Sequence, residues 1–200
     1  MSVPLARSSK RRRVTKETAI EASLRLDGRG ESAVSTGMAF LDHMLDIWAH
    51  HAGFDLELQA RGDLDVDFHH TVEDVGLVLG ECLHEALADN AGIARFGSAF
   101  VPLDEALSRV VVDVCGRPYL RFEVPFTTER VGSFPTELFE DFFRAFVDRA
   151  RITVHADLLH GRNGHHIAET LFKAFARALR DATRVATPGV VLSTKGTLSE

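Results

Sequence analysis

Cysteine is scarce in this sequence, because only Cys82 and Cys115 occur among its 200 residues. Each lies in an apolar segment, so we expect two buried thiols rather than a disulfide or thiolate metal ligands. A chain that does not depend on disulfides is typical of a reducing compartment, and the expected location is therefore the cytoplasm.

Long apolar runs and an excess of positive charge are also missing. No segment approaches the ~18–20 apolar residues of a membrane-spanning helix. The net charge of −6 argues against nucleic acid as the main partner. The basic run at residues 10–13 has no apolar segment after it, which argues against a signal peptide. We expect residues 1–13 to form a basic N-terminal tail.

Histidine is well represented, and its most informative pattern occurs twice. His69-His70-Thr71-Val72-Glu73 is followed 96 residues later by His165-His166-Ile167-Ala168-Glu169. After each copy, apolar residues recur at spacings of three, four and seven, which predicts an amphipathic helix. Both copies therefore stand at the start of a helix.

Helix geometry indicates what these residues can bind. Residues four apart share a helix face, so His69 with Glu73, and His165 with Glu169, can each bind one ion. The second histidine of each copy points roughly 100° away. A histidine pair at a helix start is often only a polar cap or a solvated face, but the exact repetition favours two metal ions. We expect the second histidine of each copy to serve the other ion.

The repeat also predicts the architecture. Each half is expected to contain strand, strand, helix, strand and helix, which indicates an α+β fold of two duplicated βαβ-type halves, each a mixed sheet covered by helices. We expect one domain over residues 14–187, with pseudo-repeats at 14–92 and 93–187, and a C-terminal tail at 188–200. The expected strands are residues 14–26, 54–60, 107–114, 119–124 and 151–156, with extended chain up to residue 35 and a loop at 90–97. The helix before the motif is expected at residues 40–48 in the first half and 138–146 in the second.

Superposing these two helices pairs His43 with Asp141. If His43 binds one ion, Asp141 is its counterpart at the other, although a helix aspartate is often only solvated. Imidazole and carboxylate ligands without thiolate suit manganese, iron, zinc or cobalt. The first ion is expected to bind His43, His70, His165 and Glu169, and the second His69, Glu73, Asp141 and His166.

Several further motifs, taken together and in order, resemble the imidazoleglycerol-phosphate dehydratase family over nearly the whole chain. Besides the doubled histidine motif they are Phe40-Leu41-Asp42-His43-Met44-Leu45, Pro102-Leu103-Asp104-Glu105-Ala106-Leu107, Gly116-Arg117-Pro118-Tyr119, Phe172-Lys173-Ala174 and Ser193-Thr194-Lys195-Gly196. The resemblance implies the fold of the second domain of ribosomal protein S5. It also implies a lyase of histidine biosynthesis that converts imidazole glycerol phosphate to imidazole acetol phosphate. Two Mn²⁺ ions per site, and a homo-oligomer of twenty-four subunits built from trimers with sites between subunits, are implied as well.

The resemblance also assigns residue roles. The proton to be removed lies on an unactivated carbon, and two ions that hold the two imidazole nitrogens would stabilise the imidazolate that expels the hydroxyl group. Glu17 would act as the acid–base residue and His51 would help to move the hydroxyl proton. The contacts to substrate and phosphate would be Arg95, Arg117, Lys173, Ser193 and Lys195. Without the resemblance, each of these would be interpreted as an ordinary surface residue.

The sequence departs from the family pattern at three positions. Asp141 stands where histidine or glutamate is common, Gly164 where a polar residue is common, and Ala52 where glycine is expected. No phosphatase-like domain is present in the sequence, so we expect a single-function form. Two alternatives stay open: a dinuclear metallohydrolase acting on a small phosphate ester, and a metal-binding or assembly protein without catalysis.

Overall fold

The computed structural model describes residues 7–187, 189–194 and 198. It contains two four-stranded mixed sheets of identical strand order, β1-β2-β4-β3 and β5-β6-β10-β7. In each sheet the last strand runs parallel to its neighbour and the other pairs are antiparallel. The elements of the first half are β1 (Ser8–Val14), β2 (Thr18–Arg25), β3 (Ser32–Ser35), α1 (Ala39–Ala52), β4 (Asp55–Gly62) and α2 (His69–Leu87). Those of the second half are β5 (Phe96–Leu103), β6 (Ala106–Asp113), β7 (Tyr119–Glu123), β8 (Arg130–Val131), β9 (Phe134–Pro135), α3 (Leu138–Ala150), β10 (Thr153–His160) and α4 (Gly164–Thr183).

The expected duplication is therefore present, with one addition. The units β3–α1–β4 and β7–α3–β10 each join two parallel strands through a helix, as the βαβ interpretation requires. The short hairpin β8–β9 is inserted between β7 and α3 and has no counterpart in the first half. The α+β fold class is confirmed.

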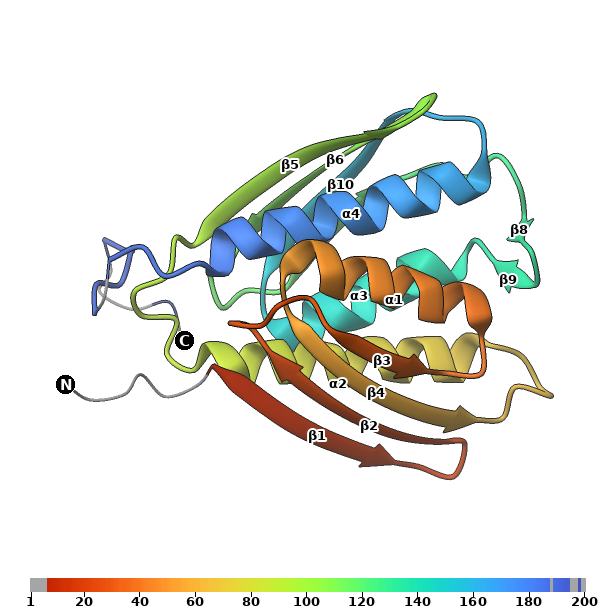
Figure 1. Ribbon diagram of the computed structural model, residues 1–200, viewed down its shortest axis with the longest axis horizontal. Coiled ribbons are helices and arrows are strands. Elements are labelled where there is room, and N and C mark those ends of the chain that lie inside the picture. The colour runs from red at the N-terminus through yellow and green to blue at the C-terminus, as the bar shows by residue number, and fades with distance from the viewer. Residues whose placement is uncertain (1–6, 188, 195–197, 199–200) are drawn as a thin grey trace.

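The helices lie between the two sheets (Figure 1). Helix α2 packs on β1 and β2, and α4 packs on β5 and β6, while α2 contacts α3 and α1 contacts α4. One continuous apolar core extends through both halves. At its centre the Trp48 ring packs against Phe146 and Phe175, with centroids 5.8 and 6.5 Å away. Neither half buries its helices alone, because helices of both halves contribute to this core.

Two glycines allow the central helices to approach closely. A Cβ at Gly76 would lie 2.7 Å from the carbonyl oxygen of Phe142, and one at Gly80 would lie 2.4 Å from that of Phe146. Both neighbours are backbone atoms of α3, which cannot move independently of the helix. The glycines of α2 therefore set the distance to α3.

Apart from the short β8–β9 hairpin, two strands were missed by the sequence prediction, and both are the first strand of a half. Residues 8–13, expected in a tail, form β1 together with Val14. Residues 15–17, expected within a strand, form the turn before β2. The pattern of β1 is not apolar because Arg11 and Arg13 pair with Glu85 and Asp74 of α2.

The second missed strand is β5, which begins at the end of the expected loop 90–97. In β5 the small residues Gly97 and Ala99 are buried, whereas the large rings of Phe96 and Phe100 are exposed. The alternation is thus opposite to that of an ordinary amphipathic strand, because α4 lies too close for large side chains.

Both cysteines are free and buried, as expected. Burial raises the pKa of the Cys82 thiol to about 11, so this side chain stays protonated near neutral pH. Among the helices that the structure describes, none combines the length and apolar character needed to cross a membrane.

Candidate functional site

The predicted metal ligands all come from the first two turns of four helices. His43 lies in α1, His69, His70 and Glu73 in α2, Asp141 in α3, and His165, His166 and Glu169 in α4. The N-terminal ends of these helices lie at one end of the molecule, on the right in Figure 1. Cations are disfavoured by the positive ends of helix dipoles, so carboxylates are needed here to hold them.

One set of ligands converges within a single chain. The ligand atoms of His43, His165 and Glu169 all lie within 4.8 Å of one another, the only group of three such residues found in the described part of the chain. His165 Nε2 lies 3.1 Å from a carboxylate oxygen of Glu169, which confirms that these residues share a helix face. Burial raises the pKa of Glu169, but hydrogen bonds from Lys173 and His165 outweigh it and lower that pKa. The site thus combines two imidazoles with an ionised carboxylate.

A second, looser set lies between α2 and α3. His69 Nδ1 is 3.4 Å from a carboxylate oxygen of Asp141, and Glu73 follows His69 by one helical turn. A pocket of about 540 Å³ opens beside His69 and Asp141. Its other charged residues are mostly acidic: Asp67, Glu137 and Glu140, with Arg130 as the cation. Such a surface attracts a cation more readily than a phosphate group.

His70 and His166 diverge from their neighbours, as helix geometry predicts. The ring planes of His69 and His70 differ by 78°, and those of His165 and His166 by 88°. Within this chain neither His70 nor His166 joins the group of three. Each instead lies beside a carboxylate that the sequence interpretation did not identify. His70 Nδ1 is 3.0 Å from Asp63, and His166 Nδ1 is 2.8 Å from Glu105.

These carboxylates also change the charge of the site. Hydrogen bonds from His166 and from the backbone N–H groups of Asn163 and Arg162 lower the pKa of Glu105 to about 2. The Asp63 hydrogen bond raises the pKa of His70, and the Glu105 hydrogen bond raises that of His166. The position of Glu105 directly before β6 matches that of Glu17 directly before β2, so the repeat contained a signal for Glu105.

Glu17 lies on the β1–β2 turn and not within a strand as expected. Its carboxylate is 3.9 Å from His70 Nδ1, and its side chain is 55% exposed. This places the residue at the histidine end of the molecule with its carboxylate accessible to a bound molecule.

His51 lies further along α1. Eight residues at about 1.5 Å each place it roughly 12 Å along the helix from His43. Burial, followed by the positive charges of Lys173 and His50, lowers the pKa of His51. It is therefore largely neutral near pH 7 and able to accept a proton.

The predicted phosphate contacts lie elsewhere. Arg95 donates to both carboxylate oxygens of Asp113, at 2.8 and 3.2 Å, and to the carbonyl oxygen of Leu192 at 2.5 Å. It therefore fixes the C-terminal segment that carries Ser193. Among the residues that the structure describes, three of its five N–H donors are used in this way.

Arg117 lies in the turn between β6 and β7 and is exposed. Lys173 belongs to the histidine end instead, since its Nζ lies 2.5 Å from Glu169. Lys195 lies outside the described residues.

Arg95, directly before β5, and Arg117, after β6, are thus far from the histidines of the same chain. Arg95 precedes β5, whereas the opposite end of that strand leads to Glu105 and His166. Eight residues at about 3.3 Å each make the strand roughly 26 Å long. This exceeds the length of a glycerol phosphate attached to an imidazole ring, so one such molecule cannot contact both groups of the same chain.

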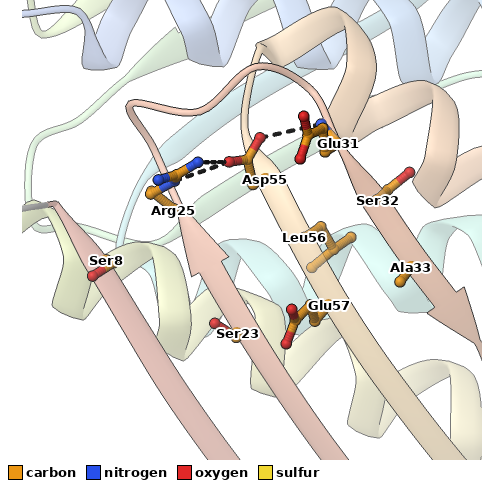
Figure 2. Close-up of a pocket in the computed structure, with 9 residues that line it drawn as sticks. All are labelled: Ser8, Ser23, Arg25, Glu31, Ser32, Ala33, Asp55, Leu56 and Glu57. Atoms are coloured by element: carbon orange, nitrogen blue, oxygen red, sulfur yellow. Dashed lines mark hydrogen bonds and ion pairs between the residues drawn. The ribbon is translucent and has the colours of Figure 1, made fainter.

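A different pocket, drawn in Figure 2, lies on the outer face of the first sheet and has a volume of about 520 Å³. Its arginine, Arg25, is already paired with Asp55, which also accepts hydrogen bonds from the backbone N–H groups of Arg29 and Glu31. Asp55 is the first residue of β4, and it is the other end of this strand that leads to the start of α2. These charged groups therefore stabilise the loop before β3, away from the histidines.

Comparisons with known proteins identify the family of this chain. A family model described as imidazoleglycerol-phosphate dehydratase matches residues 36–179. The imidazoleglycerol-phosphate dehydratase of Magnetococcus marinus is 54% identical over 98% of this chain and all of its own. That of Acidithiobacillus ferrooxidans is 55% identical over 94% of this chain and 95% of its own.

Solved structures are similar as well. The crystal structure of the imidazoleglycerol-phosphate dehydratase from Staphylococcus aureus has a TM-score of 0.82 at 42% identity, covering 90% of this chain and 99% of its own. The corresponding protein of Pyrococcus furiosus has a TM-score of 0.80 at 36% identity, covering 94% of this chain and 99% of its own. The chain therefore belongs to the imidazoleglycerol-phosphate dehydratase family.

Proposed function

We propose that this protein is the hydro-lyase that converts imidazole glycerol phosphate to imidazole acetol phosphate in histidine biosynthesis. Membership of the family supports the reaction. The observation that carries the proposal is the convergence of His43, His165 and Glu169 at the histidine end of the molecule. The metallohydrolase and the non-catalytic alternatives lack comparable support.

The proposed cofactor is a pair of Mn²⁺ ions. The donor set fits, because imidazole nitrogens and an ionised carboxylate suit a divalent metal of this kind. His43, His165 and Glu169 would hold one ion together with a His70, and His69, Glu73 and Asp141 would hold the other together with a His166. When bound, such ions act as Lewis acids toward the two nitrogens of the substrate imidazole.

We further propose that each site is shared between subunits. His70 does not join His43, His165 and Glu169 of its own chain. Arg95, directly before β5, lies roughly one strand length from the histidines. Both features are accounted for if a neighbouring copy supplies the missing histidine and the phosphate contacts. The family-based expectation of a twenty-four-subunit homo-oligomer built from trimers is consistent with this arrangement.

The protein's own side chains then have separate tasks. Glu17 would remove the carbon-bound proton of the substrate, because its carboxylate is accessible and lies beside His70. His51, held neutral by its surroundings, would accept the proton of the hydroxyl group that the product keeps as its ketone oxygen, whereas the hydroxyl group that departs must gain a proton to leave as water. Arg117, Arg95, Ser193 and Lys195 would bind the phosphate group.

Lys173 has a different place in this scheme. Its ion pair with Glu169 balances the charge of a proposed metal ligand. A contact with the substrate near the metal ions is compatible with this position, whereas a contact with a phosphate bound at Arg95 of the same chain is not.

The test is turnover of imidazole glycerol phosphate by purified protein after chelation, with and without added Mn²⁺. Product formation that depends on the metal is the expected result. Absence of turnover with two ions bound per chain would contradict the proposed dehydratase function, and a metallohydrolase would then be the favoured function. We also propose a cytoplasmic location, supported by the two free, buried cysteines.

A further inference from the structure

The β5–β6 turn contacts the start of α4. Leu103 pairs with Ala106, so Asp104 and Glu105 form a two-residue turn. Asp104 has a φ of +47°, which reverses the chain sharply. The turn thereby presents Glu105 to the loop before α4.

Glu105 uses both carboxylate oxygens there. One oxygen accepts hydrogen bonds from the backbone N–H groups of Arg162 and Asn163, at 3.1 and 2.8 Å. The other lies 2.8 Å from His166 Nδ1. Asn163 in turn accepts from the backbone N–H of His165 and caps the helix. A single side chain therefore connects the turn, the loop and the second histidine of the motif.

This arrangement determines which nitrogen of His166 can bind a metal. An ionised carboxylate only accepts hydrogen bonds, so the proton of a neutral His166 must be on Nδ1. The lone pair is then on Nε2, the nitrogen that faces away from Glu105. We propose that Glu105 is a positioning residue that fixes the tautomer and orientation of His166 for metal binding through Nε2. The proposal rests on the proposed role of His166 as a metal ligand.

The duplication explains why Glu105 is suited to this role. Glu17 and Glu105 both precede the second strand of their halves, and both lie beside the second histidine of a motif. Glu17 stays 3.9 Å from its histidine and is 55% exposed, whereas Glu105 is hydrogen-bonded and 27% exposed. Equivalent positions thus carry one accessible glutamate and one that is held in place.

The test uses Glu105→Gln, which separates the two contacts of the side chain. The amide oxygen can still accept from the two backbone N–H groups, so the loop stays fixed. The amide NH₂ then faces Nδ1 of His166 and donates to it, which forces the proton to Nε2 and blocks the metal-binding nitrogen. A matched control is Glu21→Gln, which makes the same change in a surface ion pair with Lys10.

Two quantities are measured: Mn²⁺ affinity by competition with a chelator, and the melting temperature of the metal-free protein. We expect Glu105→Gln to lower the affinity for one of the two Mn²⁺ ions by about 10–100-fold. The melting temperature of the metal-free variant should equal that of the control. Unchanged affinity, or an affinity loss matched by a lower melting temperature of the metal-free protein, would overturn the proposal.

His166→Ala is measured alongside. If it weakens Mn²⁺ binding while Glu105→Gln does not, the positioning role alone is wrong. If His166→Ala leaves Mn²⁺ affinity unchanged, both the ligand role of His166 and the role of Glu105 are wrong.

Discussion

The two halves of this protein share one topology but differ in the side chains that complete it. In both, a His-His-x-x-Glu motif begins the last helix, and the ring planes of its two histidines are close to perpendicular. At equivalent positions in the preceding helix, one half carries His43 and the other Asp141. The turn glutamate is accessible in the first half and hydrogen-bonded in the second. Features set by helix periodicity have therefore stayed equivalent, whereas turn residues have taken different tasks.

The largest expected effect tests the equivalence of His43 and Asp141. Each of His43→Ala and Asp141→Ala should remove one of two Mn²⁺ ions per chain and lower kcat by about 1,000-fold or more, since metal activation supplies several kcal/mol. Metal analysis and steady-state kinetics check this. A variant that keeps both ions would show that its residue is not a ligand, and the halves would then differ in how they bind metal.

Glu17→Gln tests the difference between the turn glutamates. We expect kcat to fall by about 100–10,000-fold with both ions retained, because a proton-transfer group is lost and no metal ligand is. Glu105→Gln should instead lower the affinity for one Mn²⁺ ion. If Glu17→Gln also reduced metal content, the two glutamates would have the same role and the proposed divergence would be wrong.

The turns after β2 and β6 provide a third comparison. Arg29 and Arg117 each follow a glycine at equivalent positions, and both are exposed. Arg117→Ala should raise KM about 10–100-fold, since a charge-assisted hydrogen bond to phosphate contributes ~1.5–3 kcal/mol. Arg29→Ala is the control and should leave KM unchanged. Equal effects of the two substitutions would remove Arg117 from the substrate site. Lys195→Ala should raise KM in the same way as Arg117→Ala.

The smallest expected effect concerns stability and involves the first half alone. Asp55 begins β4, whereas the residue that begins β10 is the uncharged Thr153. Burial raises the pKa of Asp55, but hydrogen bonds from the backbone N–H groups of Arg29 and Glu31 and from Arg25 outweigh it and lower that pKa to about 2. A lowered folded-state pKa means that the ionised group stabilises the fold above about pH 4, and that this contribution disappears as the pH falls toward 2.

Asp55→Asn should accordingly lower the free energy of unfolding at pH 7 by about 1–2 kcal/mol after allowance for solvent screening. It should also flatten the dependence of stability on pH between about 4 and 2. Denaturant titrations at several pH values check both. An unchanged slope in the acid range would show that Asp55 does not govern acid unfolding.

Much of the fold was predictable because local patterns specify it. The alternation in residues 54–60 and the apolar stripe after each histidine motif correspond to β4, α2 and α4. The two missed strands, β1 and β5, contact helices through arginines and small residues and so lack an apolar face. Their identity as strands depends on partners that are distant in the sequence.

The candidate site divides in the same way. The sequence by itself determined the pairing of His165 with Glu169, because residues four apart on a helix share a face. Its repeat also paired His43 with Asp141, and their ligand roles stay predictions. The structure brings His43 to His165 and Glu169, as predicted for the first ion. Only the tertiary structure decided that His70 stays apart from this group, that Glu105 contacts His166, and that Arg95 lies a strand length away. Helix periodicity is a local property, whereas these distances depend on how two sheets and four helices pack around one shared core.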